Sequence, residues 1–220
     1  KFLNHGFDHI EFSVKNAAQH EKMWQCFGFE KVFDGKNPQK GVHQLVMQQG
    51  QVRLILSEYD ESPQAKAQPG YSFLEKHGDG ICVLGMEVED AHAAFQETVA
   101  RGARPALEPK TYESAEGQVV IAEIYSPADF RYRFVTRQVR DFKSPALFLD
   151  AIVAKRLESP SPTGLYRIDH LTNNIDMGQF QIWLDFYKNV FQFKAVRRFN
   201  IKTGRTGLLS DVVQSDCGRI

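Results

Sequence analysis

The sequence predicts an α+β protein built from repeated strand-helix-strand-strand-strand units, arranged in two domains of which the second is incomplete. The order strand, helix, strand, strand, strand occurs twice before residue 137. A stretch punctuated by proline then interrupts the pattern, and the opening pattern returns at Tyr166. Such self-similarity is typical of duplicated modules. We therefore predict a first domain at residues 1–137, a linker at 138–165 and a second domain at 166–220.

The first unit begins with a strand at residues 7–14, where apolar and polar side chains mostly alternate. Asn16 can cap the helix that follows, which runs through Phe27 to the helix-ending Gly28. Three more strands complete the unit, at residues 29–33, 42–47 and 52–56.

The second unit follows a loop that we expect around Pro63 and Pro69. Its first strand covers residues 81–88, and Asp90 caps a helix that continues to Arg101. Its other strands are predicted around residues 106–112, 119–124 and 132–135.

The third copy is recognisable by its Asp-His pair. In the first copy Asp8-His9 lies on the opening strand, and in the later copy Asp169-His170 takes the matching place. A Phe-x-Phe junction between helix and strand recurs in both copies. The later copy has only 55 residues, about 80 fewer than the first full copy, so we expect a truncated second domain. Between the copies a short helix is expected at residues 146–156.

Composition excludes several classes of protein. Lys+Arg and Asp+Glu both number 27, so the net charge of zero gives no reason to expect nucleic acid or an anionic membrane as partner. No apolar run reaches the roughly 18 to 20 residues that span a bilayer. The three cysteines form no CxxC pair and predict neither a disulfide framework nor a zinc site. We expect a cytoplasmic protein with reduced thiols.

His170 is the candidate metal ligand. It follows Asp169 near the start of a predicted strand, where alternation points one of the two side chains inward. Imidazole is a common ligand of iron, zinc and copper, and an acceptor nearby can hold its second nitrogen. A strand histidine taken alone is more often a core or surface residue, so the residue type leaves both interpretations open.

Short motifs occur in a family-specific order along nearly the whole chain. The second domain contains Ile168-Asp169-His170-Leu171, Thr206-Gly207-Leu208-Leu209-Ser210 and Asp216-Cys217-Gly218. The first domain contains Phe7-Asp8-His9-Ile10-Glu11-Phe12, His77-Gly78-Asp79-Gly80 and Ala100-Arg101-Gly102-Ala103. Together they resemble the 4-hydroxyphenylpyruvate dioxygenase family. The resemblance implies the vicinal oxygen chelate fold, in which strand-helix-strand-strand-strand units form half-barrels around a metal.

The resemblance also implies a reaction. In this family Fe(II) is held by two histidines and one glutamate, and the enzyme converts 4-hydroxyphenylpyruvate and O2 to homogentisate and CO2. His170 matches the first iron ligand and Ser210 matches a substrate-pocket residue. Thr172 lies two residues after His170 on the same face of the predicted strand, so we expect it to face the pocket too. For Ser210, a strand-edge hydroxyl bonded to backbone is an equal alternative. The other two ligands are expected after Ile220, so we expect this chain alone to be inactive. A homo-oligomer is also implied.

Three alternatives remain open. His9 occupies the position of His170 in the first copy, but its unit offers Cys82 and Arg133 where a second histidine and an acid would be needed, so we predict a buried structural role for it. A hydroxymandelate synthase would use the same substrate and iron but oxidise the side chain. A metal-free binding protein of the same fold would use no iron.

Overall fold

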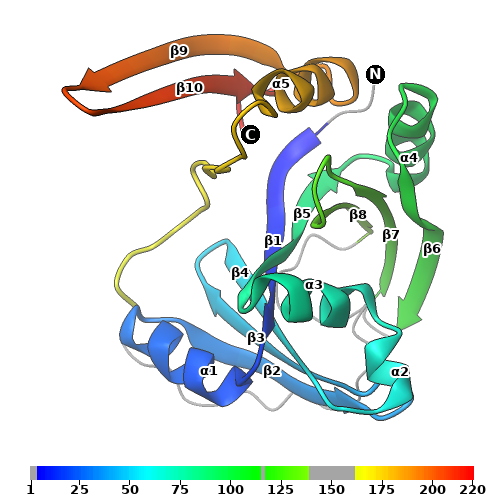
Figure 1. Cartoon of the computed structure of the whole chain (residues 1–220). Helices are drawn as coiled ribbons and strands as arrows, with labels where there is room; N and C mark the ends of the chain where they lie inside the picture. The colour runs from blue at the N-terminus through cyan, green and yellow to red at the C-terminus, as the bar shows by residue number, and fades with distance from the viewer. Residues whose placement is uncertain (1–3, 115–116, 139–161) are drawn as a thin grey trace.

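One sheet of eight strands, in the order β2-β3-β4-β1-β5-β8-β7-β6, organises the first part of the chain in the computed structural model (Figure 1). The structure describes residues 4–114, 117–138 and 162–220, so the helix predicted at 146–156 and most of the predicted linker lie outside the described residues. The strands of this sheet are β1 (Asn4–Val14), β2 (Glu30–Asn37), β3 (Val42–Gln49), β4 (Val52–Tyr59), β5 (Gly80–Val88), β6 (Pro105–Ser114), β7 (Gly117–Tyr125) and β8 (Arg131–Arg137).

The sheet consists of two halves with the same topology. In the first half the spatial order is β1-β4-β3-β2, and in the second half it is β5-β8-β7-β6. The first strand of each half pairs in parallel with the last strand of that half. The halves join where β1 and β5 pair antiparallel. The duplication predicted from the sequence is therefore confirmed, and the curled sheet has the half-barrel form expected of a vicinal oxygen chelate fold.

The two long crossover helices begin as predicted. Asn16 caps α1 (Ala17–Cys26) because its side chain accepts a hydrogen bond from the backbone N–H of Gln19. Asp90 caps α4 (Ala91–Ala100) in the same way, with two backbone N–H groups as donors. Each helix covers its own half of the sheet.

The prediction of a loop around Pro63 and Pro69 is wrong, because this segment contains two helices. They are α2 (Pro63–Lys66) and α3 (Pro69–His77). Each proline occupies the start of its helix, where the missing N–H costs nothing and the fixed φ angle favours the first turn. Within the described ranges, no helix combines the length and the apolar character needed to cross a membrane.

Alternating side chains divide the core between the two faces of the sheet. On β3, Leu45 and Met47 pack toward α1, while Val46 packs on the opposite face with Ile55 of β4 and Val135 of β8. This alternation is what a strand covered on both faces requires. The second face also encloses polar and charged side chains.

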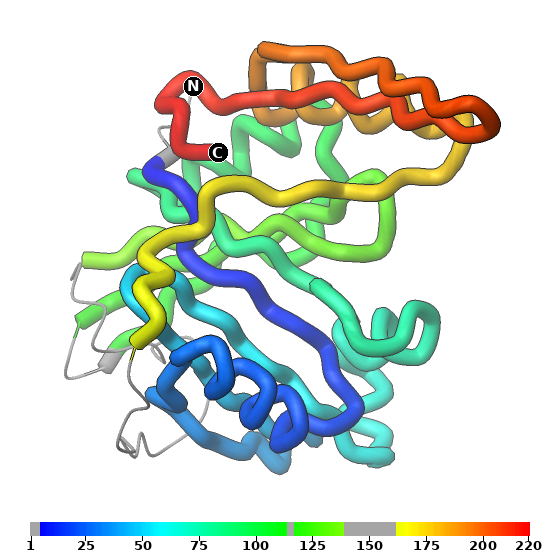
Figure 2. The backbone as a smooth tube through the Cα atoms, turned by 90° about the vertical axis from the view of Figure 1, so that its left-hand side faces the viewer, coloured from blue at the N-terminus to red at the C-terminus, as the bar shows by residue number. Residues whose placement is uncertain are grey.

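The last part of the chain forms a separate hairpin. Its strands are β9 (Lys194–Thr203) and β10 (Thr206–Gln214), which follow the helix α5 (Phe180–Asn189). The hairpin extends away from the large sheet (Figures 1 and 2). The prediction of a strand around His170 is wrong, because residues 162–176 form neither helix nor strand. An extended segment becomes a strand only when another strand satisfies its backbone.

Instead, the segment is fixed by a side chain of the large sheet. The side-chain oxygen of Gln49 accepts hydrogen bonds from the backbone N–H groups of Thr163, Gly164 and Leu165, at 2.8, 3.0 and 3.1 Å. The backbone N–H of Gln51 then donates to the carbonyl of Tyr166 at 2.7 Å. Downstream, aromatic residues of α5 and of the following turn pack on β8.

Candidate functional site

His170 is held by its neighbour and open to solvent. Its Nδ1 lies 2.8 Å from a carboxylate oxygen of Asp169, and its side chain is 79% exposed. A proton on Nδ1 leaves the lone pair on Nε2, which is the nitrogen that a metal can take. Among the described residues, no side chain engages this Nε2.

His9 repeats the same pairing in a buried setting. Its Nδ1 lies 2.6 Å from an Asp8 carboxylate oxygen, and both side chains are buried. Here Nε2 is covered, because Arg133 donates a hydrogen bond from Nη1 to it at 3.0 Å. Burial lowers the pKa of His9 more than the charge of Asp8 raises it, which favours the neutral ring. The predicted burial of His9 is confirmed, and the guanidinium of Arg133 occupies the side of the ring where a metal would bind.

Arg133 also joins two buried carboxylates. Its Nη1 donates to Glu11 at 2.8 Å and its Nε donates to Glu123 at 2.6 Å. Glu123 accepts a second bond from Arg131. Burial would raise the pKa of Glu123, but the charges of Arg133 and Arg131 outweigh it and hold that pKa below its usual value.

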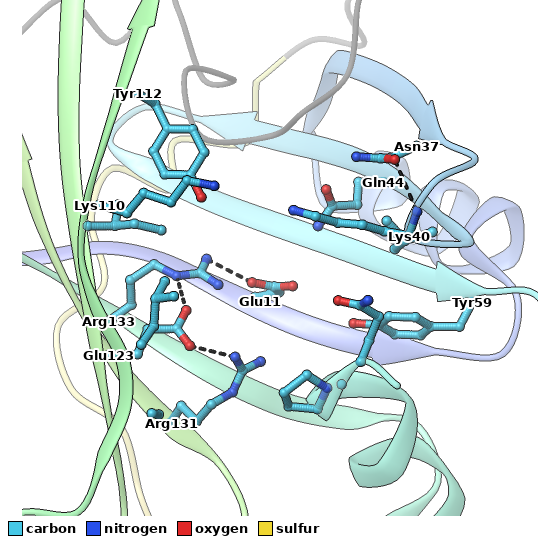
Figure 3. A pocket seen from close by; sticks show the side chains of 17 residues that line it. Glu11, Asn37, Lys40, Gln44, Tyr59, Lys110, Tyr112, Glu123, Arg131 and Arg133 are labelled. Atoms are coloured by element: carbon cyan, nitrogen blue, oxygen red, sulfur yellow. Dashed lines mark hydrogen bonds and ion pairs between the residues drawn. The ribbon is translucent and has the colours of Figure 1, made fainter. Parts of the chain in front are cut away.

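A chain of hydrogen bonds continues from Glu11 on β1 through Ser57 on β4 to Gln44 on β3. The hydroxyl of Ser57 donates to Glu11 at 2.8 Å, and the amide of Gln44 donates to Ser57 at 2.9 Å. Glu11 and Gln44 border a cavity of about 270 Å³ inside the curled sheet (Figure 3). The sequence interpretation missed this cavity. The signal was present in the charged residues at alternate positions of β8, which place Arg131 and Arg133 on one face.

The predicted substrate residues lie apart from this cavity. Ser210 lies on β10, where it pairs with Phe199 of β9, and it is partly buried. Thr172 is exposed in the segment without regular structure, two residues after His170. Their roles, like that of His170, stay predictions.

The described residues can be compared with the donor set of the expected iron site. They contain no group of three or more His, Cys, Asp or Glu side chains that could hold a metal ion. His170 has the donor chemistry of one ligand, with Asp169 as the outer acceptor that fixes its ring. The donor set present therefore fits one position of a 2-His-1-carboxylate triad.

A family model and several known proteins match this chain. A family model described as "Hydroxyphenylpyruvate dioxygenase, HPPD, N-terminal" matches residues 3–137. A 4-hydroxyphenylpyruvate dioxygenase from Legionella pneumophila is 31% identical over 98% of this chain and 56% of its own length. Protein MelA from Shewanella colwelliana is 29% identical over 97% of this chain and 56% of its own length.

A solved structure shares the fold. A mutant of 4-hydroxymandelate synthase from Streptomyces coelicolor superposes with a TM-score of 0.78 at 20% identity, over 98% of this chain and 61% of that chain. The chain thus spans about half the length of the curated relatives it matches. Because the family model matches residues 3–137, more than half of the chain, the chain belongs to the hydroxyphenylpyruvate dioxygenase family.

Proposed function

We propose that this chain is the N-terminal part of an Fe(II)-dependent 4-hydroxyphenylpyruvate dioxygenase, which converts 4-hydroxyphenylpyruvate and O2 to homogentisate and CO2. The observation that carries the proposal is the Asp169-His170 pair, whose Nε2 is open where the Nε2 of His9 is covered. In this proposal residues 1–137 form a supporting domain, 138–165 a linker, and 166–220 the start of the catalytic domain. We also expect a cytoplasmic homo-oligomer.

Each proposed residue has a distinct task. His170 holds one position on the iron through Nε2, while Asp169 keeps the proton on Nδ1 and fixes the orientation of the ring. Ser210 and Thr172 contact the α-keto acid. When bound, the ferrous ion supplies the redox chemistry with dioxygen that the side chains lack.

The test uses the full-length protein, with iron content and turnover measured together. His170→Ala should remove ferrous binding and activity. Asp169→Asn should retain binding but weaken it by about 10- to 100-fold, as loss of an outer-shell partner does in other metal sites. His20→Ala is the matched control, because His20 also pairs with a carboxylate, that of Asp79 at 2.8 Å, on the first domain. Full iron content in the His170→Ala protein would contradict the proposal.

Product analysis separates the two related reactions. Homogentisate from 4-hydroxyphenylpyruvate supports the proposal, and hydroxymandelate identifies a synthase instead. If the wild-type full-length protein binds no iron and does not turn over 4-hydroxyphenylpyruvate, the metal-free binding protein becomes the better description. For the 220-residue chain alone, we expect neither tight ferrous binding nor turnover.

A further inference from the structure

The cavity inside the large sheet has no task in the proposed iron chemistry. It lies in the domain where Arg133 covers the histidine, and its walls come from both halves of the sheet (Figure 3). Its volume of about 270 Å³ is slightly below the range of roughly 300–1,000 Å³ that suits drug-sized ligands. A compact molecule therefore fits.

Both carboxylates of the cavity are already hydrogen-bonded to protein groups through both of their oxygens. Both oxygens of Glu11 accept a hydrogen bond, one from Ser57 and one from Arg133. Both oxygens of Glu123 are occupied in the same way, by Arg133 and Arg131. A buried carboxylate whose charge is already matched by guanidinium groups offers little to a second cation.

The cationic groups, by contrast, keep donors available. Arg131 donates to Glu123 through Nη1, and this is the one hydrogen bond that its side chain makes within the described part of the chain. Lys110 places Nζ over the ring of Tyr112, 4.6 Å from the centroid, and pairs with no described carboxylate. The start of α3 also lines the cavity, and Gln68 gives it no side-chain cap. An uncapped helix N-terminus adds positive potential.

The rest of the lining is mixed, with Asn37, Lys40 and Gln44 beside apolar side chains. Val42, Leu107 and Ile121 contribute to its walls, with the ring of Tyr59 on the side opposite Arg133 (Figure 3). We propose that this cavity binds a small organic carboxylate, with the anionic group toward Arg131 and Lys110 and the apolar body against these side chains. The site is independent of His170 and of iron, so its test can fail without affecting the proposed dioxygenase activity.

Calorimetric titration of the purified chain tests the chemistry of the ligand. Benzoate is the probe, benzylamine has the same ring with the opposite charge, and inorganic phosphate is an anion without an apolar body. We expect saturable binding of benzoate, no binding of benzylamine and weaker binding of phosphate. Equal binding of benzylamine, equal binding of phosphate, or no binding of benzoate overturns the proposal.

Two variants and a control place the binding in the cavity. Lys110→Gln removes an exposed charge on an edge strand and should weaken benzoate binding by about twofold to fivefold, as expected for an exposed ion pair. Leu107→Trp fills the cavity and should abolish binding. Lys202→Gln, an exposed lysine on β9, should leave binding unchanged. Circular dichroism checks the fold of each, and if Leu107→Trp does not fold, Lys110→Gln decides. Benzoate binding that Lys110→Gln leaves unchanged contradicts the site.

Discussion

Arg133 donates a hydrogen bond to Nε2 of His9 over 3.0 Å, so a protein cation occupies the outer nitrogen of the first Asp-His pair. The second pair, Asp169-His170, leaves the same nitrogen open. Two copies of one motif therefore have different chemistry, and the difference lies in what faces the ring.

Replacing Arg133 should lower the free energy of unfolding of the first domain. Arg133→Met leaves Glu11 and Glu123 buried without their shared cation, and loss of one partner of a buried ion pair costs about 3–5 kcal/mol. Urea denaturation measures the free energy of unfolding. Arg205→Met, at an exposed position in the hairpin turn, should cost less than about 0.5 kcal/mol. A loss of stability no larger than that of the control would show that the network is not structural.

Stability should fall with decreasing pH in the acid range. Burial raises the pKa values of Asp8, Glu11 and Glu123, but their arginine partners outweigh it and hold all three below their ordinary values. Their contribution is therefore complete above the unfolded carboxyl pKa of about 4 and is lost as the pH falls through the lower folded values. Urea midpoints between neutral and acid pH measure this loss. Glu123→Gln should flatten the acid limb, and an unchanged acid limb would contradict the assignment.

Enlarging Gly85 should displace His9. The two residues are register partners in β1 and β5, and a Cβ on Gly85 would overlap the imidazole ring. Gly85→Ala should cost about 1–3 kcal/mol, the usual cost of overpacking a core. Gly80→Ala on the same strand is the control, because its Cβ would meet Phe73 at 3.3 Å, where a small shift suffices. Thermal unfolding of both variants gives the comparison, and equal losses would argue against a tight fit around His9.

A hydrogen bond between two tyrosines should stabilise the packing of α5 on the large sheet. The hydroxyls of Tyr132 and Tyr187 lie 2.8 Å apart, and Tyr132 is buried among aromatic rings. Each single change to Phe leaves one hydroxyl without this partner and should cost about 1 kcal/mol. The double change should cost less than the sum of the two, because the shared hydrogen bond is lost only once. A double-mutant cycle by urea denaturation measures the coupling, and strictly additive losses would exclude it.

Local signals were sufficient where an element depends on its own residues. Asn16 and Asp90 were recognised as caps because a helix start needs a side-chain acceptor close in sequence. The strands of the large sheet followed from alternation, and the repeated order of elements gave the two matching halves. Pro63 and Pro69 misled the prediction because proline both marks loops and starts helices, and only the neighbouring backbone distinguishes the two.

The sequence by itself determined that Asp-His recurs and that its second copy, at His170, is the candidate ligand. Only the tertiary structure decided which atoms face each ring. Arg133 is 124 residues from His9 in the chain, and it reaches the imidazole because β5 pairs with both β1 and β8. No local pattern encodes such a contact, since it depends on which strands become neighbours when the apolar faces are buried. The charged cavity arose in the same way, from side chains of strands in both halves that meet only in the folded sheet.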